Sequence, residues 1–230
     1  LAMDPATGKT AWRQVRPTEA IDESFETYGT PVPLTVDGRV DLVISGGDNV
    51  TGHDPATGAE RWRWAYNTKH RNWQRLIPSP TPGAGRVFVP MPRGNRLVTL
   101  EPAGETARPV WELRGPTTDS ATPLLYDGRL YVLDSDRKNL RVLEPETGTE
   151  RGTVDLGGAV WRASPTGADG KVYCLSVDGE AAVIRAGDTP EILTRIDMGG
   201  KNVRSTIAVA GGRLFIRTHD RLWCVGGQGG

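Results

Sequence analysis

The sequence lacks any run of about 18 consecutive apolar residues, the length that a membrane-spanning helix requires. An excess of charge of one sign is also missing, because 28 lysines and arginines balance 28 aspartates and glutamates. We therefore expect no transmembrane segment in this chain and no global electrostatic field that would attract nucleic acid. Any partner must be selected by a local surface.

Cysteine and histidine are scarce. Cys174 and Cys224 are too few for a disulfide framework, and we expect both to be small buried residues of successive repeats. His53, His70 and His219 lie in different repeats, with no second ligand at metal-binding spacing. We therefore expect no metal site.

Catalytic motifs are absent as well. No Gly-x-Ser-x-Gly elbow or phosphate-binding loop occurs, so we assign no catalytic residue. The segment from Asp134 to Asn139 resembles a calcium loop but lacks its glycine and remaining carboxylates, and we interpret it as a hairpin turn. No segment shows the i, i+3, i+4, i+7 pattern of a helix.

What the sequence does contain is an internal repeat. The string Ala-Met-Asp-Pro-Ala-Thr-Gly-Lys-Thr-Ala-Trp at residues 2–12 returns at 52–62, more weakly at 100–111 and 143–148, and in eroded form at 184–188. A second landmark, a glycine followed by a basic residue, recurs in step with it at Gly38, Gly85, Gly128, Gly170 and Gly212. The period of roughly 42 to 50 residues is typical of a propeller blade.

Each repeat reads as four strands. Residues 121–156 alternate apolar and polar positions in short runs, and Asp-Gly and Thr-Gly pairs separate the runs as hairpin turns. The predicted fold is all-β, a β-propeller of four-stranded antiparallel blades in one domain, residues 1–230. We expect complete blades at 29–67, 78–114, 120–156 and 162–198, and partial blades at 1–16 and 203–227. Partial blades at both ends suggest the later part of a seven- or eight-bladed ring.

The repeated motif has a mechanical interpretation. Aspartate bonds the backbone two residues on, proline fixes φ after a strand, and glycine supplies a positive φ. The tryptophan that follows falls on the outermost strand, where it can cover the seam with the next blade. The residues to which we assign this blade-docking role are Asp4, Gly8, Trp12, Asp54, Gly58, Trp62, Trp111 and Gly148.

Residues that precede each innermost strand belong at the mouth of the central channel. They combine arginines with aromatic residues, which suits an anionic group, a carbohydrate or a protein loop. The candidate binding residues are Tyr28, Arg71, Trp73, Arg75, Asp119, Trp161, Arg162 and Arg204. The alternative is structural: Trp73 and Trp161 would pack between blades, and the arginines would pair with carboxylates such as Glu26.

The strings around Asp4 and Asp54 resemble the Ala-x-Asp-x-x-Thr-Gly-x-x-x-Trp signature of pyrroloquinoline-quinone (PQQ) repeat propellers. That family includes quinoprotein dehydrogenases and a quinone-free lipoprotein that assists outer-membrane protein assembly. The adjacent Cys-Cys pair of alcohol-oxidising members and their Cys-x-x-Cys-His haem motif are absent from this sequence. The chain therefore resembles the quinone-free type more closely.

This resemblance implies a non-catalytic, monomeric scaffold in the bacterial cell envelope, periplasmic or otherwise extracytoplasmic. It would bind a protein or glycan partner through its channel-mouth loops, without a cofactor. Two alternatives remain open at this point. One is a fragment of a PQQ-dependent oxidoreductase, with PQQ and calcium held by upstream blades, and the other is the sensor propeller of a membrane-bound kinase.

Overall fold

The computed structural model describes residues 1–158 and 160–227. Over these residues the regular structure consists of strands β1 to β21 and two short 3-10 turns, η1 (Asp22–Phe25) and η2 (Pro92–Gly94). The described chain has no helix long and apolar enough to cross a membrane. The prediction of an all-β fold is confirmed.

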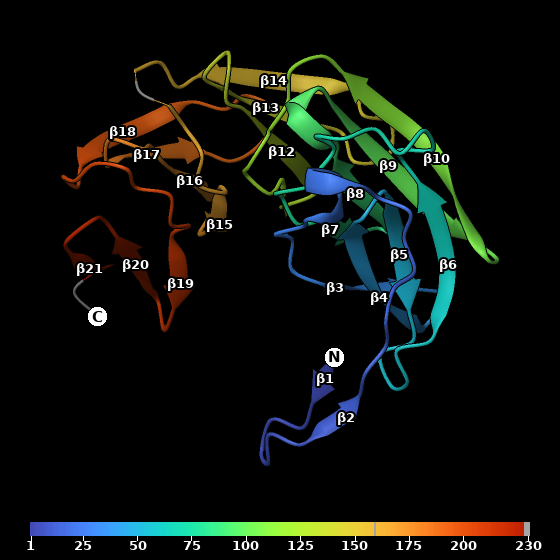
Figure 1. The fold of residues 1–230 in the computed structure, drawn as a ribbon. Helices are drawn as coiled ribbons and strands as arrows, with labels where there is room; N and C mark the ends of the chain where they lie inside the picture. The colour runs from blue at the N-terminus through green and yellow to red at the C-terminus, as the bar shows by residue number, and fades with distance from the viewer. Residues whose placement is uncertain (159, 228–230) are drawn as a thin grey trace. The chain divides into compact units, whose positions relative to one another are not determined.

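The chain divides into two compact units. The N-terminal unit comprises Leu1–Arg93 and Leu97–Glu112, and the C-terminal unit comprises Gly94–Arg96 and Leu113–Gly230. Each unit consists of antiparallel meanders whose strands follow one another in sequence order. Figure 1 labels the strands of both units.

The N-terminal unit begins with a two-stranded hairpin, β1 (Ala2–Met3) and β2 (Thr10–Trp12). Its first four-stranded meander is β3 (Val32–Val36), β4 (Arg39–Gly46), β5 (Asn49–His53) and β6 (Glu60–Ala65). Its second is β7 (Thr81–Gly83), β8 (Arg86–Pro90), β9 (Arg96–Ala103) and β10 (Thr106–Arg114). One parallel pairing, Thr106 with Arg63, joins the outermost strands β10 and β6. The two meanders thus form one eight-stranded sheet in the order β3-β4-β5-β6-β10-β9-β8-β7.

The C-terminal unit contains two more four-stranded meanders and a three-stranded one. The first is β11 (Leu124–Tyr126), β12 (Arg129–Asp134), β13 (Asn139–Leu143) and β14 (Glu150–Asp155). The second is β15 (Thr166–Ala168), β16 (Lys171–Leu175), β17 (Glu180–Arg185) and β18 (Ile192–Asp197). The third is β19 (Ala208–Ala210), β20 (Arg213–Arg217) and β21 (Leu222–Gly226). In each, a tight turn makes the first two strands neighbours. The turn is an Asp-Gly pair in the first two sheets, as predicted, and Gly211-Gly212 in the third.

The cores lie between successive meanders. In the N-terminal unit, the core cluster takes Val43 and Trp62 from the first meander and Val89 and Leu100 from the second. The C-terminal unit has two such clusters, one shared by the β11–β14 and β15–β18 sheets and one shared by β15–β18 and β19–β21. Each sheet therefore buries its apolar side chains against a neighbour, which is how repeated units gain stability.

Burial differs from the simple alternation that the sequence suggests for the inner strands. In β12, Leu130 and Tyr131 point to opposite faces of the sheet, yet both are fully buried. The outer strand β14 instead alternates between exposed and half-buried residues. Strand β12 is covered on both faces, so that Tyr131 behaves as a core residue whose hydroxyl accepts a hydrogen bond from Gly187 N (2.8 Å).

The repeated motif forms the same turn in several sheets. The Asp4 and Asp54 amides donate to the carbonyls five residues on, Lys9 O and Ala59 O, both at 2.8 Å. The Asp54 carboxylate accepts hydrogen bonds from the Ala56 amide (2.7 Å) and the Thr57 amide (3.3 Å). These bonds hold its pKa below the usual value.

Trp12 reaches from β2 to the turn of the following meander. Its indole Nε1 donates to Pro55 O (3.0 Å), and its ring covers Gly58, which has a φ of 76°. Trp62 is fully buried instead, and its Nε1 donates to the buried carboxylate of Asp41 (2.8 Å). The two tryptophans of the strongest repeats therefore differ in their contacts.

Later copies of the motif depart further. The Trp111 ring lies 5.9 Å from that of Phe88 within one meander. The Gly148 amide donates to Glu144 O (2.8 Å), as in the earlier turns. Gly152 holds the position, eight residues after the acidic residue, that Trp12 holds in the first copy. It leaves room there for the segment that contains Pro190.

Candidate functional site

In the N-terminal unit, the segment 22–28 and the loop 70–75 lie against each other. The Ser24 hydroxyl donates to Arg71 O (2.7 Å) and accepts from the Gln74 amide (2.9 Å). The Asn72 side chain accepts from the Glu23 amide (3.2 Å). Because Ser24 is fully buried, these bonds are shielded from water and fix the loop to the segment.

Three aromatic side chains project from this pair of segments. Phe25 is 64% exposed, Tyr28 62% and Trp73 57%. The Arg93 guanidinium lies 6.0 Å from the centre of the Trp73 ring, and its Nε donates to Trp73 O (3.2 Å). Arg71 is also exposed. We call Phe25, Tyr28, Arg71, Trp73 and Arg93 the aromatic surface.

Two of the predicted binding residues in this unit have partners within the chain. Arg75 forms an ion pair with Glu23 and so braces the loop. The Tyr28 hydroxyl donates to the Glu26 carboxylate (2.6 Å), and that hydrogen bond raises the tyrosine pKa. Tyr28 keeps an exposed ring, whereas the Arg75 side chain is only partly exposed.

A network of polar side chains that was not predicted from the sequence holds the loop 70–75 in place. The Asp48 carboxylate is buried, and it accepts from the Asn67 amide group (2.7 Å) and contacts His70 Nδ1 (2.9 Å). His70 Nε2 lies 3.0 Å from the exposed carboxylate of Glu19. This histidine therefore joins two carboxylates from distant parts of the sequence and ties the loop to the β4–β5 turn.

In the C-terminal unit, the structure brings Asp119 and Arg162 together. Both line a cavity of about 280 Å³. Its remaining lining residues are Ser120, Ser135, Asp136, Lys138 and Val160. The lining combines the carboxylates of Asp119 and Asp136 with the cations Lys138 and Arg162. The Ser120 hydroxyl donates to Arg162 O (3.4 Å), 42 residues away, and so links the two segments.

The other two predicted residues of this unit lie elsewhere. Trp161 is fully buried, and its Nε1 donates to Gly157 O (3.0 Å), so its ring is part of the core rather than of an accessible surface. Arg204 is exposed and lines a different cavity of about 200 Å³ with Arg217 and His219. The eight candidates therefore do not form one cluster: four lie in the N-terminal unit, two share one cavity, one is in the core and one borders another cavity.

Neither cysteine is among the residues of these candidate sites. Both cysteines are free; Cys174 is buried as expected, but Cys224 is exposed, because its strand β21 is the last of a three-stranded sheet. Nowhere in residues 1–158 and 160–227 do three His, Cys, Asp or Glu side chains gather closely enough to hold a metal ion.

Solved structures show the same fold. BamB from Moraxella catarrhalis matches with a TM-score of 0.69 and 15% identity, over 94% of this chain and 62% of its own. The quinohemoprotein alcohol dehydrogenase ADHIIG from Pseudomonas putida HK5 matches with a TM-score of 0.62 and 15% identity, over 90% of this chain and 40% of its own. The chain thus spans about three fifths of the BamB structure and less of the dehydrogenase. At these identities the likeness shows the fold, which is a β-propeller.

Sequence comparison gives the family. No curated protein sequence matches the chain. The family model described as outer membrane protein assembly factor BamB matches residues 1–225, which is nearly the whole sequence. The chain therefore belongs to the BamB family of PQQ-like repeat propellers.

Proposed function

We propose that this propeller is a non-catalytic scaffold that binds a protein partner in the bacterial cell envelope, in the service of outer-membrane protein assembly. The observation that carries this proposal is the aromatic surface. Phe25, Tyr28 and Trp73 are each more than half exposed, although the exposure of large apolar surface to water is unfavourable, and Arg71 and Arg93 lie on the same surface. Tryptophan, tyrosine and arginine are the residues that contribute most to binding energy at protein interfaces.

The contacts that fix the loop 70–75 also support a role in protein binding. Buried Ser24 and the Asp48–His70 contact hold the loop before any partner arrives. A loop fixed in advance loses little conformational entropy on binding, so more of the contact energy appears as affinity. Protein is favoured over glycan as the partner because Trp73 is already engaged by Arg93 and three exposed rings suit apolar side chains.

Site-specific photocrosslinking in the source cells tests the proposal. A crosslinking amino acid replaces Trp73 in the full-length protein, and in a matched control it replaces Leu222, which is also exposed but lies on β21 in the other unit. We expect one envelope protein to be captured at position 73 and not at 222, and Arg93→Ala to reduce that capture at least fivefold. Equal capture at both positions would show that Trp73 is an ordinary surface residue.

A second experiment addresses catalysis. PQQ and calcium are the groups that an oxidoreductase of this fold would need, and the described residues contain no cluster of three metal-binding side chains that fits calcium. The full-length protein is titrated with the quinone and calcium, and dye-linked alcohol or sugar oxidation is followed. We expect no quinone-dependent oxidation; its appearance would contradict a purely non-catalytic role.

A further inference from the structure

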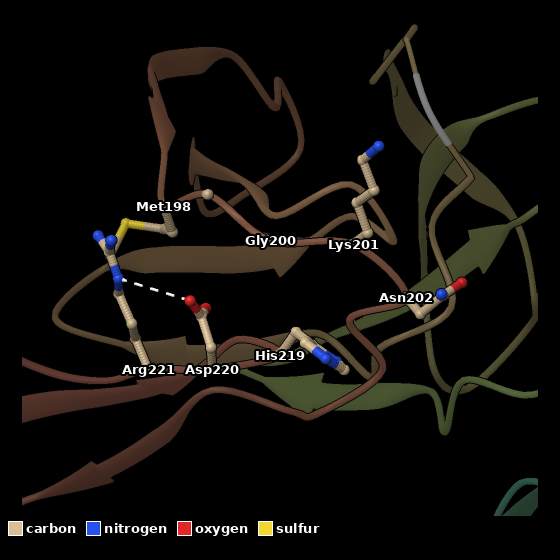
Figure 2. A pocket seen from close by; sticks show the side chains of 8 residues that line it. Met198, Gly200, Lys201, Asn202, His219, Asp220 and Arg221 are labelled. Atoms are coloured by element: carbon tan, nitrogen blue, oxygen red, sulfur yellow. Dashed lines mark ion pairs between the residues drawn. The ribbon is translucent and has the colours of Figure 1, made fainter.

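Two adjoining cavities in the C-terminal unit gather positive charge. One is about 490 Å³ and the other about 200 Å³, and they share Asn202 and His219. Their walls are the segment between β18 and β19 and the β20–β21 turn. Figure 2 shows the larger cavity, with Arg221 and Asp220 beside Met198 and with His219 and Asn202 toward the other end.

The lining is strongly basic. It includes the cations Lys201, Arg204, Arg217 and Arg221 together with the imidazole of His219. Among the described residues, Asp220 is the sole carboxylate of the lining, and it lies 3.9 Å from Arg221 in an exposed pair. Within the described part of the chain, Lys201, Arg204 and Arg217 have no carboxylate partner, so their charge is available to a ligand.

Thr218, whose side-chain hydroxyl is buried, is one of the residues that line the smaller cavity. The residue is 3% exposed, yet its Oγ1 has no hydrogen-bond partner among the described residues. A buried hydroxyl without a partner is unfavourable unless something else bonds to it. A ligand atom that accepts a hydrogen bond would supply the missing partner of the Thr218 hydroxyl.

The backbone between β18 and β19 contains several residues with positive φ. Gly199, Gly200 and Asn202 all have positive φ, at 71°, 105° and 56°. Backbone N–H groups in turns of this kind can bind anions, and the Gly199 amide already donates to the Asp197 carboxylate (2.8 Å). A side chain at Gly200 would also approach Thr218 Cβ to 3.1 Å, so glycine there keeps the loop close to the hydroxyl.

We propose that these two cavities form a phosphate-binding site. Guanidinium groups match tetrahedral oxyanions in geometry and can bond them with two parallel N–H donors. The smaller cavity, with Arg204, Arg217 and Thr218, receives the phosphate group itself. The larger cavity receives the rest of the ligand, with Met198 as an apolar wall and Asp220 as an acceptor for a hydroxyl group. The phosphate can belong to a soluble phosphate ester or to a lipid headgroup.

Calorimetric titration of the full-length protein with inorganic phosphate, at constant ionic strength, tests the site. We expect saturable binding that weakens at least tenfold in Arg217→Gln. The matched control is Arg185→Gln, which removes the same charge from an exposed position on β17 and should change the affinity less than twofold. Equal weakening in both variants, or no saturable binding, overturns the proposal.

Thr218→Val provides an independent test. Valine has the shape of threonine without the hydroxyl that lacks a partner, so the variant should fold with unchanged or higher stability. We expect its phosphate affinity to fall about threefold or more. Full phosphate affinity in this variant would contradict the role given to the hydroxyl and, with it, the assignment of the smaller cavity.

Two further arms identify the source of the phosphate. Glycerol 3-phosphate represents a soluble ester, and vesicles of phosphatidylglycerol, compared with phosphatidylcholine, represent an anionic lipid surface. Arg217-dependent binding of either one supports the site and names its source. This site does not depend on the proposed function: Arg217→Gln should leave crosslinking at position 73 unchanged, so that failure of one proposal can be told apart from failure of the other.

Discussion

The ring of Trp12 lies directly on Gly58, so that strand β2 of the N-terminal hairpin is held to the β5–β6 turn of the first meander. A Cβ added to Gly58 would come within 2.5 Å of the indole. The same turn receives the indole hydrogen bond at Pro55 O. Gly58 therefore has two roles: it adopts a positive φ, and it makes room for Trp12.

Gly58→Ala should destabilise the protein more than Gly38→Ala. Both glycines have nearly the same φ, 76° and 75°, so both variants incur a backbone cost of about 1 kcal/mol. Only at Gly58 does the new methyl group meet a ring, which adds about 1–3 kcal/mol, whereas at Gly38 nothing lies within 4 Å. Urea unfolding measures both. Equal losses, or a loss at Gly58 that persists at the same size when Trp12 is also changed to Ala, would contradict the contact.

Asp41→Asn should weaken the protein at neutral pH and matter less in acid. Burial alone would raise the pKa of Asp41, but hydrogen bonds from Arg61 (2.6 Å) and Trp62 (2.8 Å) outweigh it and hold that pKa below its usual value. The charged carboxylate therefore contributes stability above about pH 4, which is lost as the pH falls through the lower folded pKa. We expect a loss of about 2–3 kcal/mol at pH 7.

The pH dependence distinguishes this role from simple packing. Urea unfolding at pH 7 and at pH 3 should show that the difference in unfolding free energy between Asp41→Asn and the parent protein becomes smaller in acid. At pH 3 the Asp41 carboxyl of the unfolded parent binds a proton more readily than that of the folded parent, which favours unfolding of the parent. Glu191→Gln is the control, since its pair with Arg185 is solvent-exposed and should be worth no more than about 0.5 kcal/mol. A difference that stays constant with pH would mean that the charge of Asp41 is irrelevant.

The repeat was sufficient to predict the β-propeller because its turn chemistry is local. Asp54 bonds amides two and three residues away, so four-stranded meanders can be read from spacing alone. The solvent exposure of individual side chains could not be predicted from the spacing of the repeats. Trp73 and Trp161 both precede inner strands, yet one is exposed and the other buried, because burial is decided by the neighbouring sheet.

Sites formed by residues far apart in sequence were missed for the same reason. Lys201 and Arg217 border adjoining cavities only because β19 and β20 turn the chain back on itself. Of the residues that line these two cavities, only Arg204 was among the predicted binding residues, from its place before an inner strand. His70 and Asp48 meet across a comparable separation.

Gly152→Ala should be among the most destabilising single substitutions in the C-terminal unit. A Cβ there would overlap Asp188 O and approach Pro190 Cδ to 2.7 Å. The first of these is backbone and cannot rotate away, so we expect a loss of more than about 2 kcal/mol. Gly227→Ala, whose added methyl group meets nothing within 4 Å, is the control for thermal unfolding. Similar melting temperatures for the two variants would show that the segment at Asp188 moves freely.

The two cysteines should differ sharply in reactivity. Cys174 is 1% exposed, and burial raises the pKa of its thiol to about 12, so it stays protonated and shielded at any pH from 6 to 9. Cys224 is exposed on β21. A disulfide reagent added to the native protein should therefore modify one thiol per chain, and none in Cys224→Ser, whereas the denatured parent should give two. Rapid reaction of Cys174 in native Cys224→Ser would mean that the core shared by β11–β14 and β15–β18 opens readily, because the reagent can reach the thiol only when those sheets separate.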